Sequence, residues 1–165
     1  MINWPRLISE FKYGKPVCVL YIHLVFSPCR YGRKIEVLLM AIKIEDQFFS
    51  QKHVTEEDVK LFAGISGDHN PLHLDAEFAS KTMFKQRIIH GMLTASLISA
   101  ALASMPGTII LLNFCLSFEK PVYIGDNLTA KVTVKKIENS KIYLDAEVTR
   151  GNDRVVSGTV KILKR

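Results

Sequence analysis

Residues 91–105 have the sequence GMLTASLISAALASM, and Pro106-Gly107 follows them directly. No side chain in this stretch carries a charge. A helix that is apolar on every side is expected to be buried on every side. Fifteen residues are too few to cross a bilayer as a helix, which takes about 20. The stretch therefore predicts a helix that runs through the interior of the protein.

The chain after this helix has the pattern of an antiparallel sheet. Four strand-like runs cover residues 108–118, 127–137, 142–149 and 155–163, with turn-forming residues between them. Apolar and polar side chains alternate clearly in the second run, which reads LTAKVTVK at residues 128–135. One buried helix followed by a meander of strands predicts an α+β fold, with the sheet curved around the helix.

Shorter elements precede the helix. Residues 48–54 are a strand candidate, and Thr55 followed by three acidic residues marks a helix start. Apolar residues then recur at helical spacing until Gly67, where this helix is expected to stop. Pro71 keeps Asn70 out of the helical region, so we expect an ordered turn there. Residues 76–81 form a second short helical stretch.

Composition excludes several classes of function. The chain has 165 residues, 48% of them hydrophobic and 23% charged, as in an ordinary globular domain. Residues 1–39 carry four of its six net positive charges, so the remainder is nearly balanced. No basic stripe interleaved with aromatic residues occurs, which argues against nucleic acid. Three widely spaced cysteines form neither a disulfide framework nor a metal knuckle, and they favour a reducing, cytoplasmic location.

The N-terminal 39 residues differ from the rest. They contain an uncharged run of ten residues, 17–26, which is too short for a membrane helix. Ser27-Pro28-Cys29 follows, which is a poor signal-peptide cleavage site. We expect either a β-type segment packed on the domain or an extension outside it. The predicted organisation is an extension over residues 1–39 and one domain over residues 40–165.

The densest set of reactive side chains lies in the turn at residues 67–73, GDHNPLH. Asp68 and His73 are five residues apart, and the turn can direct both side chains into one cleft. A carboxylate beside an imidazole can move protons in both directions near neutral pH. By spacing alone the signal is weak, because most Asp and His residues in loops are surface polar groups or local caps.

Three segments resemble the MaoC-like, (R)-specific enoyl-CoA hydratase family. They are residues 62–73 (FAGISGDHNPLH) with Ala79, residues 89–93 (IHGML) and residues 118–126 (FEKPVYIGD). The resemblance runs from about Met40 to the C-terminus. It implies the hot-dog fold, a sheet wrapped around a central helix. It also implies a homodimer or higher homo-oligomer, with sheets side by side and acyl-thioester pockets near the interface.

The resemblance also implies the roles of individual residues. Asp68 and His73 would be the catalytic pair, and Asn70 would order the pair and its water. Gly91 would offer its backbone N–H to the thioester oxygen. That role agrees with physics, because a helix N-terminus suits developing negative charge. Further along the helix, Met92, Ser99 and Leu102 would contact the acyl chain; for Ser99 and Leu102, core packing is the alternative.

The leading hypothesis is an enzyme that reversibly hydrates acyl thioesters. Coenzyme A or acyl carrier protein would carry the acyl group. We expect no metal, no redox cofactor and no membrane partner. A hot-dog thioesterase is the second, although residues 91–105 lack the acid that such enzymes often carry. A non-catalytic acyl-binding module is the third. His90, which precedes the helix, either holds the turn before it through its ring or takes a direct part in catalysis. The cationic residues Lys81, Lys85 and Arg87 meet coenzyme A phosphates or form a solvated face.

Overall fold

The structure is a computed structural model that describes residues 41–165. The expectations for residues 1–39 lie outside the described residues. Five strands form one antiparallel sheet with the order β1-β3-β4-β5-β2. Their bounds are β1 Gln47–His53, β2 Ile109–Phe118, β3 Asn127–Glu138, β4 Lys141–Arg150 and β5 Asp153–Lys164. The predicted meander is confirmed for β3, β4 and β5. The first strand after the helix, β2, pairs with β5 instead and lies at the far edge of the sheet.

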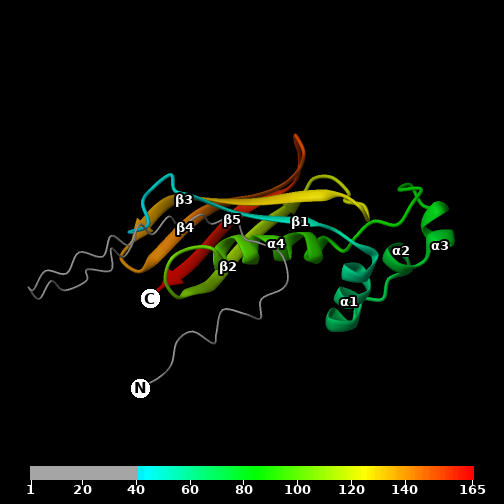
Figure 1. The fold of residues 1–165 in the computed structure, drawn as a ribbon, viewed down its shortest axis with the longest axis horizontal. Coiled ribbons are helices and arrows are strands. Elements are labelled where there is room, and N and C mark those ends of the chain that lie inside the picture. Colours follow the sequence, from blue (N-terminus) through cyan, green and yellow to red (C-terminus); the bar gives the residue numbers. More distant parts are fainter. Residues whose placement is uncertain (1–40) are drawn as a thin grey trace, which may run out of the picture. The chain divides into compact units, whose positions relative to one another are not determined.

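The uncharged stretch forms helix α4, Gly91–Ala103, which packs across one face of the sheet (Figure 1). This arrangement confirms the α+β hot-dog prediction. Buried side chains on α4 join the core, among them Ile98, Ala101 and Leu102. The prediction of burial on every side is wrong, because Met92 is 50% exposed and Ser99 is exposed as well. One face of the helix is therefore left free for something other than the sheet.

Three helices form one end of the described domain (Figure 1). Helix α1, Glu56–Ser66, begins at a capping box between Thr55 and Asp58 and ends at Gly67 in the left-handed conformation, as predicted. Helix α3, Ala76–Ser80, is the second short helical stretch. Between them, Pro71–Leu74 forms the single helical turn α2 rather than the ordered, non-helical turn expected. Asn70 stays non-helical and caps α2 through its side chain, because proline suits the first position of a helix.

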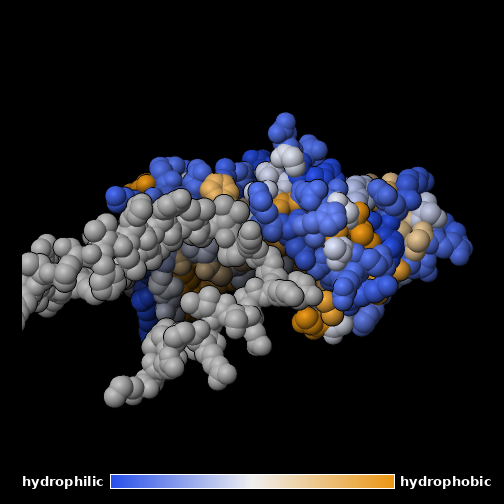
Figure 2. Space-filling model, viewed as in Figure 1, coloured by the Kyte–Doolittle hydropathy of each residue, from blue (hydrophilic) through white to orange (hydrophobic). Residues whose placement is uncertain are grey.

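Apolar side chains also reach the surface. At the helical end Leu61, Ile65 and Met83 are 58%, 86% and 84% exposed. Figure 2 shows apolar patches on an otherwise hydrophilic surface over this end. Strand β2 is exposed along most of its length, including Cys115. No helix among residues 41–165 is long and apolar enough to cross a membrane.

Candidate active site

The turn after α1 builds one half of the site. Gly67 ends the helix in a left-handed conformation, and the next backbone N–H, that of Asp68, donates to Ser66 Oγ at 3.2 Å. Asp68 Oδ1 in turn accepts from the N–H of Asn70 at 3.2 Å. Short polar side chains commonly fix turns by bonding to backbone two residues on. The Asp68 side chain stays half exposed, with its other oxygen free to face a neighbour.

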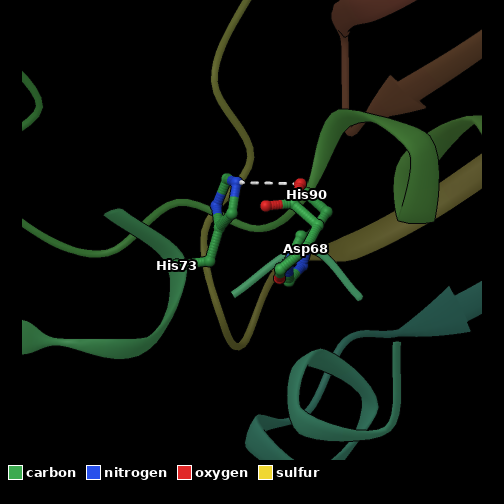
Figure 3. Close-up of side chains that lie close together, drawn as sticks. All are labelled: Asp68, His73 and His90. Atoms are coloured by element: carbon green, nitrogen blue, oxygen red, sulfur yellow. Dashed lines mark hydrogen bonds and ion pairs between the residues drawn. The ribbon is translucent and has the colours of Figure 1, made fainter. Parts of the chain in front are cut away.

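His73 provides the other half, from the single turn α2. Its side chain is nearly buried, and Nδ1 lies 2.8 Å from the carbonyl oxygen of Ile88. A carbonyl oxygen only accepts, so Nδ1 carries the proton in the neutral ring and Nε2 keeps a lone pair. Nε2 lies 4.0 Å from Asp68 Oδ2 (Figure 3). The structure thus brings the two predicted catalytic side chains together, with the basic nitrogen on the carboxylate side.

The gap of 4.0 Å is too long for a direct hydrogen bond. An oxygen atom placed between the two groups can lie about 2.8 Å from each, which is a normal hydrogen-bond length. The pair can therefore hold one water molecule or one hydroxyl group and exchange a proton with it. Asn70 orders the pair through its main chain, because its carbonyl accepts from the His73 N–H at 3.0 Å. The Asn70 side chain is used to cap α2.

Gly91 begins α4 beside this pair. The helix has no side-chain cap at its N-terminus, so its first N–H groups are not taken by a capping side chain. Gly91 and His73 line the same cavity of about 310 Å³, together with Phe118. A Cβ atom on Gly91 would lie 3.1 Å from the Phe118 ring. The glycine therefore opens the approach to the helix terminus.

Met92, Ser99 and Leu102 meet at a second cavity, of about 220 Å³, between the free face of α4 and strand β2. Apart from two serines its lining is apolar, with side chains such as Phe114 and Leu116. The three residues predicted to contact the acyl chain are thus brought together, in a cavity whose lining includes neither His73 nor Gly91. Asp68 and Asn70 belong to the lining of neither of these two cavities.

Donor atoms of Asp68, His73 and His90 lie within 4.8 Å of one another in the cluster of Figure 3, a spacing that could hold a metal ion. The two imidazole rings face each other at 4.0 Å between centroids. Imidazole lone pairs lie in the ring plane, so facing rings do not direct them to one point. The arrangement suits proton transfer better than metal binding.

Three basic residues near the site were candidates for phosphate binding. Arg87 is instead bound through both terminal nitrogens to Glu56, at 2.5 and 3.0 Å. This ion pair lowers the pKa of Glu56 to about 2, mainly through the Arg87 hydrogen bond. Lys81 pairs with Glu77 on α3. Of these three residues, only Lys85 has no ion pair with another described residue. The ion pairs of Lys81 and Arg87 favour a local structural role for those two.

Sequence reasoning missed two groups that shape the site. The Ile88 carbonyl that orients His73 is a main-chain atom, so no side-chain pattern could reveal it. Phe118 was seen only as the start of a motif, yet its ring closes the cavity over Gly91. Its position at the end of a strand of apolar residues was the only available signal.

Comparison with known proteins gives consistent matches. Residues 41–156 match the family model described as "MaoC like domain". An (R)-specific enoyl-CoA hydratase of Rhodospirillum rubrum is 45% identical over 100 residues, 59% of this chain and 69% of that protein. A 3-hydroxybutyryl-CoA dehydratase of Methylorubrum extorquens is 39% identical over 121 residues, 70% of this chain and 77% of that protein. The solved (R)-hydratase of A. caviae superposes with a TM-score of 0.73 at 34% identity, covering 76% of this chain and 99% of that one.

Proposed function

The chain belongs to the family of MaoC-like domains, and from this membership and the geometry of its site we propose that it is a hydro-lyase acting on acyl thioesters. It adds water reversibly to trans-2-enoyl thioesters and gives (R)-3-hydroxyacyl thioesters. The observation that carries the proposal is the gap of 4.0 Å between His73 Nε2 and Asp68 Oδ2, with the opposite ring nitrogen of His73 fixed by the Ile88 carbonyl.

The reaction needs one base and one acid, which the pair supplies. One member removes a proton from the water as its oxygen bonds to C3 of the substrate. A proton from the pair is delivered to C2, so the two atoms of the double bond gain the elements of water. Asp68 and His73 act together as one proton-transfer unit in this scheme. The scheme calls for no metal or redox cofactor.

Negative charge develops on the thioester oxygen during this addition. The uncapped N-terminus of α4 at Gly91 supports its stabilisation, because backbone N–H groups and the helix dipole favour negative charge there. Loss of one such donor typically costs about 3 kcal/mol of transition-state stabilisation. The apolar cavity at Met92, Ser99 and Leu102 supports a site for the acyl chain.

We further propose that the protein works in the cytoplasm as a homodimer, with coenzyme A or acyl carrier protein as the substrate's carrier. Strand β2 lies at the edge of the sheet, and large apolar side chains on it are 40–52% exposed. An exposed apolar edge strand is a pairing surface. A second copy joined there would extend the sheet and cover the acyl cavity, because β2 forms one of its walls.

The direct test follows the absorbance of crotonyl-CoA after the protein is added. Hydration removes the conjugated double bond without releasing thiol. The absorbance therefore falls while a thiol reagent detects no free thiol. Release of free thiol would instead favour the thioesterase. No change with C4 to C12 enoyl thioesters on either carrier would contradict the proposed activity.

The first prediction concerns the catalytic pair. Asp68→Asn keeps the side-chain volume and removes the charge, and His73→Gln removes the imidazole. General acid–base assistance typically contributes ~10²–10⁴-fold, so each variant is expected to lose at least 100-fold in kcat. The double variant is expected to be scarcely slower than the poorer single one, because the two groups act together. Steady-state kinetics and melting temperatures are measured on the same preparations. A folded Asp68→Asn protein with near wild-type turnover would contradict the proposed acid–base mechanism.

A further inference from the structure

His90 is the most deeply buried polar side chain beside the site, with 1% of its surface exposed. Its Nδ1 is the one buried side-chain nitrogen or oxygen without a hydrogen-bond partner among residues 41–165. Buried polar atoms are nearly always paired, and an exception calls for an explanation. A leucine or phenylalanine would fill this position with no unpaired nitrogen, so the packing of the core does not explain a histidine.

The other ring nitrogen gives the first part of the explanation. His90 Nε2 lies 2.9 Å from the main-chain carbonyl oxygen of Asp68 and must donate to it. This bond joins residues 22 positions apart and ties the turn that carries the Asp68 carboxylate to the start of α4. Since Gly67 ends α1 just before Asp68, the His90 bond is a fixed point for the exposed turn.

The face of the His90 ring gives the second part of the explanation. The His73 ring stacks on His90 with 4.0 Å between centroids, and Phe62 packs at 5.1 Å. His73 is also held at its Nδ1 by the Ile88 carbonyl, two residues before His90. The segment 88–90 is itself fixed to the chain before β3, because the Ile89 N–H donates to Val122 O at 2.8 Å. The anchored segment 88–90 therefore contacts His73 in two places. The Ile88 carbonyl binds a ring nitrogen, and the His90 ring packs against the ring face.

We propose that His90 is a positioning residue for the hydration reaction proposed above: its N–H fixes the Asp68 main chain while its ring supports the His73 imidazole, and together these contacts set the gap between the two reacting groups. The role rests on the proposed function and adds a residue that touches neither water nor substrate. It also explains the unpaired Nδ1. Among the ordinary side chains, only histidine combines a small flat ring with an N–H donor at its far end.

Two variants separate the two contacts. His90→Gln keeps a donor that can reach the Asp68 carbonyl but removes the ring. His90→Phe keeps the ring and removes the donor. A misplacement of about 1 Å in a reacting group can cost ~10²-fold. We expect each variant to lower kcat by ~10–100-fold while KM changes less than ~3-fold, because the contacts to substrate remain. His53→Gln is the matched control, since this exposed histidine lies at the end of β1 and, among the described residues, its side chain hydrogen-bonds only to Asn127 at the start of β3.

A double-mutant cycle with Asp68→Asn distinguishes positioning from a loss of folding. If His90 acts through the pair, His90→Phe lowers the residual kcat of Asp68→Asn by less than ~3-fold. Full additivity of the two losses, or an unchanged kcat in both His90 variants while Asp68→Asn is inactive, would overturn the positioning role and leave the hydratase proposal intact.

A second measurement needs no substrate. Nitrogen NMR of the imidazole rings reports which ring nitrogen carries the proton. In the wild-type protein we expect His73 to show one fixed tautomer, protonated at Nδ1. In His90→Gln we expect the His73 ring signals to shift, because the ring has lost the neighbour that packs against it, whereas His53→Gln leaves the His73 signals unchanged. Unaltered His73 signals in both His90 variants would contradict the proposal even if no thioester were turned over.

Discussion

Gly91 lies where α4 begins, with the Phe118 ring close above it. A methyl group at this position would lie 3.1 Å from the ring, so the ring would have to shift by a few tenths of an ångström in the cavity that it lines together with His73. The backbone itself accepts alanine, because Gly91 is not among the residues with positive φ. We therefore predict that Gly91→Ala keeps its melting temperature within a few degrees but loses at least ~10-fold in kcat/KM, through misplacement of the thioester.

A smaller side chain at the neighbouring position is the control for this prediction. Phe118→Leu removes the ring that the new methyl group would strike. The double variant Gly91→Ala with Phe118→Leu should recover part of the lost kcat/KM. If Gly91→Ala is as active as the wild-type protein, the helix N-terminus does not hold the reacting oxygen.

At the level of single residues, the sequence predicts only those parts of the site whose residues lie close together in the chain. Asp68 and His73 lie in one turn, and a proline and a capping asparagine between them restrict its shape, so their approach could be expected. The contacts that orient them join residues 15 and 22 positions apart, through carbonyl oxygens. Main-chain acceptors are the same in every residue, and so no pattern of side chains could indicate them.

Among the elements, β2 and β5 approach each other unusually closely at Gly158. A Cβ atom there would lie 2.0 Å from the carbonyl oxygen of Cys115, which belongs to the backbone of β2 and has little room to move. We predict that Gly158→Ala destabilises the protein by at least ~2 kcal/mol, because overpacking against a fixed backbone forces the strands apart. Chemical denaturation measures the change.

Gly64 is the matched control for that substitution. It lies inside α1, and a Cβ atom there would meet nothing within 4 Å. Gly64→Ala should stabilise the protein by ~0.5–1 kcal/mol, because alanine loses less conformational entropy in a helix. Equal effects of the two substitutions would contradict the close approach of β2 and β5.

The ion pair between Glu56 and Arg87 joins α1 to the segment before α4. It lowers the pKa of Glu56 to about 2, mainly through the Arg87 hydrogen bond, whereas an unfolded glutamate titrates near 4.3. A lowered folded-state pKa means that the pair stabilises the protein above about pH 4.5 and that this stabilisation is lost as pH falls toward about 2. Because the Glu56 side chain is 42% exposed, solvent screening limits the contribution to roughly 1 kcal/mol.

Glu56→Gln tests this linkage. Urea unfolding of the wild-type protein and the variant is compared from pH 2 to pH 7. The wild-type protein should be more stable at neutral pH, and the difference should shrink as pH falls toward 2, where the carboxyl group is protonated in the unfolded state and about half protonated in the folded state. A difference that does not change with pH would mean that the ion pair contributes nothing through its charge.

The elements themselves were predictable wherever their periodicity or caps were strong. The capping box at Thr55 and the stop at Gly67 fixed both ends of α1. Strand pairing was predictable only for β3, β4 and β5, where short turns force neighbours together. The pairing of β2 with β5 depends on α4 crossing the sheet first, and apolar runs alone do not distinguish an edge strand from a central one.

At the scale of the whole molecule, the exposure of β2 predicts a dimer. Leu112 lies at a register shift in this edge strand, is 45% exposed and lines neither cavity of the site. Its exposed surface, and that of the apolar residues around it, would be buried if two sheets met edge to edge. We predict that Leu112→Lys converts the proposed dimer to a monomer at micromolar concentration, because the interface would then bury an unpaired charge from each copy.

Ile137→Lys is the control for this substitution, since Ile137 is also exposed, at 37%, but lies on β3, away from the β2 edge. Sedimentation measures the mass of each variant, and crotonyl-CoA turnover is followed on the same samples. If the acyl cavity beside β2 is completed by a second copy, the Leu112→Lys monomer should lose activity on long enoyl thioesters more than on crotonyl-CoA. A Leu112→Lys protein that stays dimeric would place the interface elsewhere, and a fully active monomer would show that each chain carries a complete site.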